Sequence, residues 1–138
     1  PFGAGKARDL YAYWSARVTA ALNADLQALG SRVVINLASS EYAKCVDRTE
    51  LNARVITPVF KDLGPRGYSM VMVFAKQQRG AMARHIIRHR LVEPAGIKAY
   101  DGDGYRFAPG ESTEEEWVFL RDRRPPHVPK KLAGGRIR

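Results

Sequence analysis

VVINLASSEYAK, residues 33–44, passes from an apolar run directly into a polar one. Residues 33–37 are almost continuously apolar, a pattern typical of a short strand that is buried on both faces of a sheet. Polar groups that follow such a strand stand at its carboxyl end, where α/β folds place their ligands. The segment therefore predicts an α/β fold, and its polar side chains Asn36, Ser39 and Ser40 are candidates for a ligand pocket.

Ser39 and Ser40 precede a short helix that we predict over residues 41–46. Backbone N–H groups at the start of a helix suit an anion, so this pair could hold one. The alternative is ordinary capping, in which a serine hydroxyl accepts a hydrogen bond from the first turn and Glu41 lies favourably in that turn. The residue types on their own favour capping.

Apolar periodicity outlines the neighbouring elements. A first helix is predicted over residues 9–29, with Asp9 as its N-cap and Gly30 at its end, because apolar residues recur there at helical spacing. β-rich runs predict further strands at residues 54–60, 68–74 and 116–120. Residues 61–67 would join the first two of these strands as an antiparallel hairpin. Pro58 either argues against a central, regularly paired place for the first strand or marks a bulge in it.

A second helix is predicted from about residue 76 to residue 91, and it concentrates positive charge. Lys76, Arg84 and Arg88 fall toward one side of it, and Arg79 lies near its first turn. Basic side chains gathered in this way indicate either a phosphate-contacting surface or an ordinary solvated helix face. Together the elements predict a fold of the α/β class, in which helices flank a mixed β-sheet of about four strands.

Neither a metal nor a cofactor is expected. His85 and His89 have the i, i+4 spacing of two metal ligands on a helix, but the HExxH pattern is absent and the neighbouring arginines would repel a cation. Asp101, Asp103 and Gly104 resemble the start of a calcium loop whose later ligands are missing, so we interpret them as a turn. The sequence also lacks the GxSxG, Walker A and dinucleotide-binding fingerprints.

The net charge of +9 is concentrated at the C-terminal end. Residues 121–138 carry seven basic side chains against Asp122 alone, together with three prolines. We therefore predict a folded part over residues 1–120 and a basic, disordered tail after it. The charge of the tail fits either non-specific contact with nucleic acid or a solubilising terminus.

The 138 residues are enough for one compact domain with one core. One thiol, Cys45, cannot form an internal disulfide, and no apolar run is long enough to span a bilayer. Both observations predict a cytoplasmic protein without membrane contact. The sequence opens on Pro1 instead of a methionine, which indicates a fragment, a processed product or an incomplete gene model.

Five segments, in order and spacing, resemble the C-terminal half of the YaaA family, which is associated with peroxide stress. They are DLYAYW (9–14), VVINLASSEYAKCV (33–46), ARVITPVFKD (53–62), FAKQQRGAMARHII (74–87) and DGYRF (103–107). The resemblance implies a larger α/β domain, about twice this length, built around a mixed sheet with a basic cleft. It also implies binding to double-stranded DNA and a role in limiting intracellular iron and oxidative DNA damage.

The leading functional hypothesis is thus a cytoplasmic DNA-binding protein of the peroxide stress response, without established enzymatic activity. Its phosphate contacts are assigned to Lys44, Lys76, Arg79, Arg84 and Arg88. Gln77 and Gln78 depart from the family pattern, in which a second lysine and a small residue are common, and this weakens the basic patch.

The alternative is an enzyme of unknown substrate, with nucleic acid as one candidate. It would use the polar cluster from Asn36 to Lys44, with Glu41 as a base and Tyr42 or Lys44 as an acid or electrostatic stabiliser. Half of a larger domain would also expose apolar surface. We therefore expect either the family's N-terminal half or a second copy of the chain to cover that surface.

Overall fold

The structure is a computed structural model, and it describes residues 10–122. Within this range the helices and strands are α1 (Leu10–Leu29), β1 (Val33–Ile35), α2 (Ser40–Ala43), β2 (Arg54–Gly64), β3 (Gly67–Ser69), α3 (Met72–Arg88), β4 (Arg106–Phe107) and β5 (Glu116–Arg121). Short 3₁₀ helices stand between α3 and β5, namely η1 (Pro94–Ala99), η2 (Gly102–Gly104) and η3 (Pro109–Glu111). The proposed N-cap Asp9 and the predicted tail from residue 123 onward lie outside the described residues.

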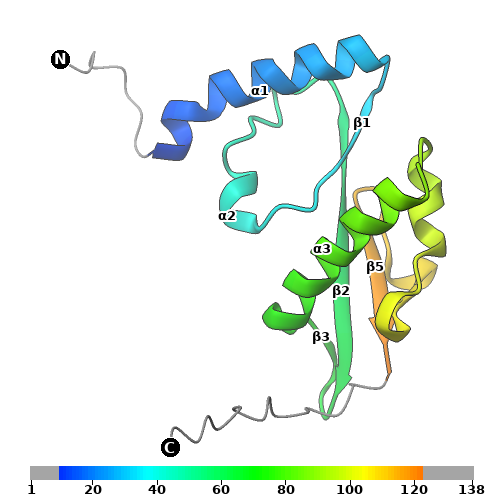
Figure 1. Cartoon of the computed structure of the whole chain (residues 1–138). Coiled ribbons are helices and arrows are strands. Elements are labelled where there is room, and N and C mark those ends of the chain that lie inside the picture. Colours follow the sequence, from blue (N-terminus) through cyan, green and yellow to red (C-terminus); the bar gives the residue numbers. More distant parts are fainter. Residues whose placement is uncertain (1–9, 123–138) are drawn as a thin grey trace, which may run out of the picture.

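The strands of residues 10–122 form one mixed sheet of five strands, in the order β1-β2-β5-β4, with β3 paired to the far end of β2. β1 and β5 run parallel to β2, whereas β3 is antiparallel to β2 and β4 is antiparallel to β5. α3 packs along β2, while α1 crosses near the start of that strand (Figure 1). The predicted α/β class and mixed sheet are confirmed, with one strand more than the sequence indicates.

β2 is the central strand, although Pro58 lies in its middle. The backbone hydrogen bonds of the two residues before Pro58 show why a proline ring is tolerated in this strand. The Ile56 carbonyl accepts from Asn36 on the β1 side, and the Thr57 N–H donates to Glu115 on the β5 side. Because backbone groups alternate in direction along a strand, Pro58 faces the β1 side, where β1 has already ended at Ile35. The missing N–H therefore costs no ladder hydrogen bond, and the prediction of a non-central position is wrong.

The strand predicted over residues 68–74 is also wrong in most of its length. β3 stops at Ser69, and α3 begins at Met72, earlier than the predicted residue 76. Ala75, Gln78 and Met82 are the buried residues of α3, and their spacing of three and four is helical. An antiparallel hairpin is present as predicted, but its paired residues are 62–64 and 67–69, so most of the predicted loop at residues 61–67 is strand.

Two separate clusters of buried side chains hold the fold. The larger cluster lies between the sheet, α3 and η1, and Phe60 stacks on Phe119 at its centre with a centroid distance of 5.3 Å. The smaller cluster lies beneath α1 and contains Leu26, Leu51 and Val55. In α1, Thr19 and Leu26 are the only buried residues. Among residues 10–122 no helix is both long and apolar enough to cross a membrane.

A buried ion pair joins the ends of β2 and β5. The Arg121 Nε donates to Asp62 Oδ1 at 2.6 Å, and the Tyr105 hydroxyl donates to Asp62 Oδ2 at 2.8 Å. Burial and the adjacent Asp62 raise the pKa of Tyr105 well above its ordinary value. Arg121, the first residue of the predicted tail, is therefore the last residue of β5 and belongs to the folded part.

Gly102 lies against the ring of Tyr100, with which a side chain at this position would collide. Tyr100 cannot move away cheaply, because it is buried and its hydroxyl donates to Gln78. We therefore predict that Gly102→Ala lowers the free energy of unfolding by about 1–3 kcal/mol. Gly110→Ala is the matched control, since nothing lies within 4 Å of a Cβ there. Urea denaturation of both variants checks this, and equal losses would contradict it.

Candidate functional site: a basic cavity beside the central strand

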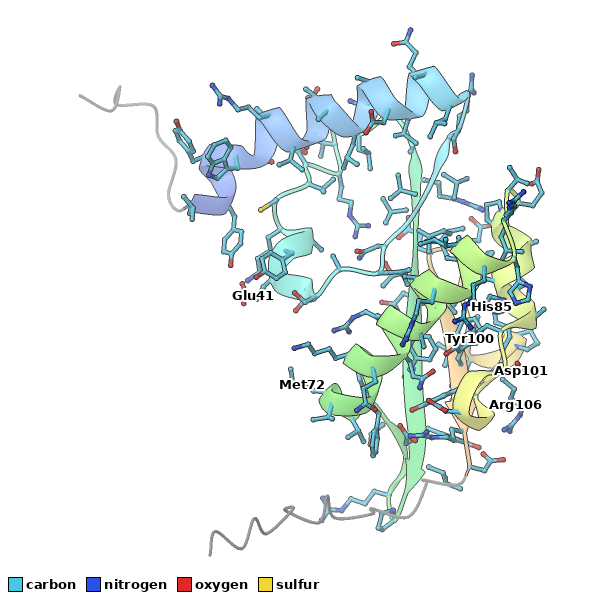
Figure 2. All side chains as sticks on the ribbon, in the orientation of Figure 1. Glu41, Met72, His85, Tyr100, Asp101 and Arg106 are labelled. Atoms are coloured by element: carbon cyan, nitrogen blue, oxygen red, sulfur yellow. The ribbon has the colours of Figure 1, made fainter. Side chains whose placement is uncertain are left out.

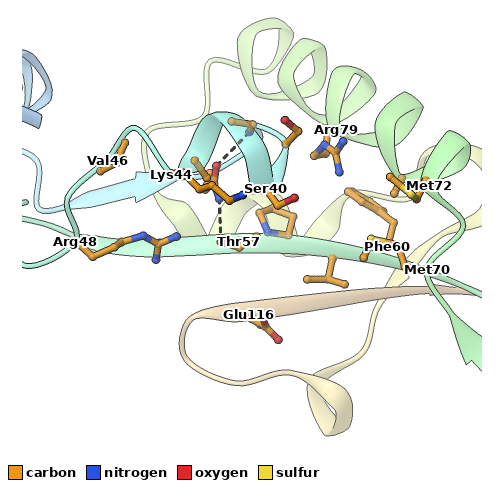
Figure 3. Close-up of a pocket in the computed structure, with 17 residues that line it drawn as sticks. Ser40, Lys44, Val46, Arg48, Thr57, Phe60, Met70, Met72, Arg79 and Glu116 are labelled. Atoms are coloured by element: carbon orange, nitrogen blue, oxygen red, sulfur yellow. Dashed lines mark hydrogen bonds between the residues drawn. The ribbon is translucent and has the colours of Figure 1, made fainter. Parts of the chain in front are cut away.

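An open cavity of about 680 Å³ lies between α2, β2 and α3 (Figure 3). Its size is within the range of pockets that hold small ligands. One wall comes from the segment after β1 and from α2, and the facing wall comes from the first turns of α3. β2 contributes Thr57, Pro58, Val59 and Phe60 between them.

Asn36 ties the first wall to the central strand. Its side-chain Nδ2 donates to Thr57 Oγ1 at 3.3 Å, while its Oδ1 accepts from the Ala38 N–H at 3.2 Å. Thr57 belongs to β2, and Ala38 belongs to the turn that leads into α2. Asn36 therefore lines the cavity, as predicted for a pocket residue, and it also fixes the shape of the wall.

Ser39 caps α2, because its Oγ accepts from the Tyr42 N–H at 3.5 Å. The helix has only four residues, so the idea that it holds an anion at its N-terminus has little support from helix geometry. Ser40, Ala43 and Lys44 line the cavity, which is the i, i+3, i+4 spacing of one helix face.

Positive charge dominates the cavity wall. Lys44, Arg48 and Arg79 line it, against a single carboxylate, Glu116, among the lining residues of the described part of the chain. Lys44 Nζ lies 3.3 Å from Glu41 Oε2, but both side chains are largely exposed, so the pair is weak and leaves Lys44 free to turn toward an anion. Arg79 approaches from α3 on the opposite side (Figure 3).

Apart from these charged residues and the polar side chains of Asn36, Ser39, Ser40 and Thr57, the lining is apolar. Phe60 and Pro58 of β2 and Ala75 of α3 are buried, and Met70 and Met72 stand at the open end. A cavity that combines cationic side chains with an apolar floor suits a ligand that has both an anionic group and a flat or apolar body.

The other predicted residues are not at this cavity. Lys76, Arg84 and Arg88 are exposed on α3 at spacings that are multiples of four, so they form a row on its outer side. Gly80 falls in the same row, and no atom lies within 4 Å of the position that a Cβ would take there. The five residues assigned to DNA contact are thus divided between a cavity pair, Lys44 and Arg79, and this outer row.

Glu41 and Tyr42, the candidate base and acid, do not line the larger cavity. Glu41 turns toward α1, where its charge raises the pKa of Tyr11. Tyr42 is exposed and borders a smaller neighbouring hollow, which it shares with Asn36 and Val34. Of the three catalytic candidates, the structure therefore brings only Lys44 to the larger cavity.

His85 lies on the last turn of α3 and His89 is its C-cap, and their ring centroids are 4.4 Å apart. Burial lowers the pKa of His85, and the neighbouring His89 lowers it further. In the part of the chain that the structure describes, no three His, Cys, Asp or Glu side chains are grouped closely enough to hold a metal ion. Residues 101–104 form a tight turn, as the sequence predicts. Asp103 Oδ2 in this turn accepts from Gln78 Nε2 at 2.6 Å.

Arg48, Thr57 and Glu116 line the cavity but were not among the predicted site residues. Thr57 and Glu116 are brought there by the pairing of β2 with β5, which places them opposite each other. No local pattern marks Thr57 as a site residue, and Glu116 is the last of three consecutive glutamates, which suggest a solvated turn instead of a cavity wall. Arg48 closely follows α2 and could have been included on its charge.

Comparison with known proteins places the chain in a family. A family model described as "Peroxide stress protein YaaA" matches residues 2–111. A UPF0246 protein of Ralstonia nicotianae is 48% identical over 114 residues, which cover 83% of this chain and 44% of the relative. UPF0246 proteins of Ralstonia pickettii and Chromobacterium violaceum are 46% and 44% identical, over 84% and 86% of this chain and 45% and 46% of their own lengths.

The chain thus spans less than half the length of these curated relatives. The matched region nevertheless includes α1, the central strand and both walls of the cavity. A match of this extent shows common descent, and the chain belongs to the peroxide stress protein YaaA family.

Proposed function

We propose that the chain contributes to peroxide resistance by binding double-stranded DNA through its basic surface, which limits oxidative damage to the DNA. The observation that carries the proposal is the position of the basic residues. Lys44, Arg48 and Arg79 converge on one cavity, and Lys76, Arg84 and Arg88 extend the positive charge along the exposed side of α3.

The outer row has dimensions that suit a nucleic-acid backbone. Lys76 and Arg88 are separated by roughly 18 Å along the helix axis at about 1.5 Å per residue. That length corresponds to roughly five base pairs at 3.4 Å each. No acidic residue interrupts α3, whose sequence carries only basic charges. Side chains on such a row can contact successive phosphates without reading the base sequence.

The test is the salt dependence of duplex affinity for two sets of charge reversals. Arg84→Glu with Arg88→Glu changes the outer row, and Lys44→Glu with Arg79→Glu changes the cavity pair. We expect each double variant to bind more weakly and to lower the slope of log affinity against log salt by about 2, roughly 1 for each lost phosphate contact.

Arg32→Glu is the control, since Arg32 is exposed on the loop between α1 and β1 and lines neither cavity. A second control removes residues 123–138, which carry much of the positive charge. If that deletion abolished binding while both double variants bound like the unchanged chain, the proposed surface would be wrong.

Limitation of intracellular iron, which the family resemblance implies, is the second part of the proposal. It is tested by measuring chelatable iron in cells by electron paramagnetic resonance, with and without a full-length relative. We expect the iron signal after peroxide to be lower when the protein is present. An equal signal would remove this part and leave DNA binding untouched.

The alternative function is enzymatic, and the observation that favours it is that Lys44, which lines the cavity, pairs with Glu41 on the neighbouring face of α2. Lys44 would stabilise negative charge on a substrate, and Glu41 would accept a proton. Glu41→Gln keeps the shape of the side chain and removes the base. Unchanged turnover of that variant in any reaction found for the family would exclude this role of Glu41.

A further inference from the structure

The β2–β3 hairpin and the first turn of α3 carry a concentration of exposed apolar side chains. We call it the methionine patch, and it consists of Leu63, Tyr68, Met70, Met72 and Val73. Met72 is 80% exposed and Val73 is 64% exposed, although both follow directly on the paired strands. Exposed apolar side chains that cluster in this way mark interaction surfaces in soluble proteins.

The methionine patch is continuous with the cavity. Met70 and Met72 belong to both, since they line its open end between β3 and α3. Met72 projects from the first turn of α3, away from the sheet (Figure 2). Methionine side chains adapt to irregular partner surfaces, which suits such a position. Anything that packs on the patch would therefore also close this end of the cavity.

We propose that the methionine patch is the docking surface for the rest of a YaaA-family chain, so that the basic cavity is completed by both parts. The length of the relatives supports this occupant. This chain matches 44–47% of them, so more than half of each relative has no counterpart here. The described residues also form two small separate clusters instead of one core, as expected when part of a larger domain is considered alone.

Charge disfavours the other possible occupants. A second copy would bring another net charge of +9 against a surface that already borders Arg79 and Lys44. Residues 123–138 of the same chain are rich in lysine and arginine, so they meet the same repulsion and offer few apolar side chains. The unmatched part of the relatives, which is more than half of their length, is therefore the occupant that we propose.

The test is the rate of thiol labelling at single introduced cysteines. Met72→Cys and Val73→Cys are made in this chain, in a Cys45→Ala background, and at the aligned positions of the full-length Ralstonia nicotianae relative. A neutral maleimide is used without DNA, and labelling is read for each peptide by mass spectrometry. We expect labelling to be at least about tenfold slower in the full-length relative, because docking buries both positions.

Ile87→Cys is the control, since Ile87 is 74% exposed at the far end of α3 and should be labelled rapidly in both proteins. Equal rates at positions 72 and 73 in the two proteins would overturn the proposal. The proposal would also be overturned if labelling of the short chain became slower as the concentration of that chain was raised, because a second copy would then cover the patch. An equal slowing at position 87 would overturn it as well. The result does not depend on DNA binding, so either proposal can fail alone.

Discussion

Arg121→Met is expected to lower the free energy of unfolding by about 3–5 kcal/mol, because it leaves the Asp62 carboxylate buried without its charged partner. Both side chains of this pair are buried, and Arg121 Nε lies 2.6 Å from Asp62 Oδ1. The Tyr105 hydroxyl would remain as the partner of Asp62, but a neutral donor cannot replace a guanidinium. Methionine preserves most of the length of the side chain, so the decrease in the free energy of unfolding measures mainly the effect of removing the charge.

Arg121 also holds other groups together. Its guanidinium lies 4.3 Å from the ring centroid of Tyr105 and 4.9 Å from that of Phe74. Its Nη1 donates to the Asp103 carbonyl at 3.4 Å, whereas Nη2 is buried with no hydrogen-bond partner among residues 10–122. The pair therefore ties β2, β5, α3 and η2 at one end of the sheet, at the cost of one unsatisfied donor.

Arg106→Met is the matched control. Arg106 pairs with Asp122 at 3.1 Å, but both of these side chains are about half exposed. An exposed pair contributes about 0–1 kcal/mol, so this variant should unfold almost like the unchanged chain. Urea denaturation followed by circular dichroism measures both. Losses of equal size in the two variants would contradict a special role for the buried pair.

Local sequence patterns were sufficient for elements whose own residues show a clear period. α1 and β5 are predicted correctly, because helical spacing and a short apolar run identify them. The turn-forming residues predict an antiparallel hairpin, but they place its loop too widely, at residues 61–67. The start of α3 is missed because Val71, Val73 and Phe74 are β-forming residue types. β4 has two residues and is defined only by its pairing with β5, which no local pattern reveals.

The candidate site was predicted in part for the same reason. Asn36, Ser39 and Ser40 follow a strand, and the rule for the carboxyl ends of strands selects them; in the structure all three line the cavity. Lys44 and Arg79 meet there only because α3 packs along β2, which is a tertiary contact. Glu41 turned out to lie on the other face of α2, because Ser39 sets the start of that short helix and with it the direction of every following side chain.

Charge reversal of the cavity pair is expected to remove most of the protection that a full-length relative gives against peroxide. The positions aligned with Lys44 and Arg79 would both become glutamate, which replaces two attractive contacts with phosphate by two repulsive ones. If DNA binding is the basis of protection, survival should fall roughly in proportion to the lost affinity, by about tenfold or more. The same reversal at the position aligned with Arg32 should leave survival unchanged.

Survival after hydrogen peroxide, measured in a deletion strain that carries each variant at equal protein level, tests the central claim most directly. The account predicts that cells with the Lys44 and Arg79 double variant die like cells without the protein, while cells with the Arg32 variant survive like those with the unchanged protein. The contradicting result is a double variant that no longer binds duplex DNA in vitro and still protects the cells fully.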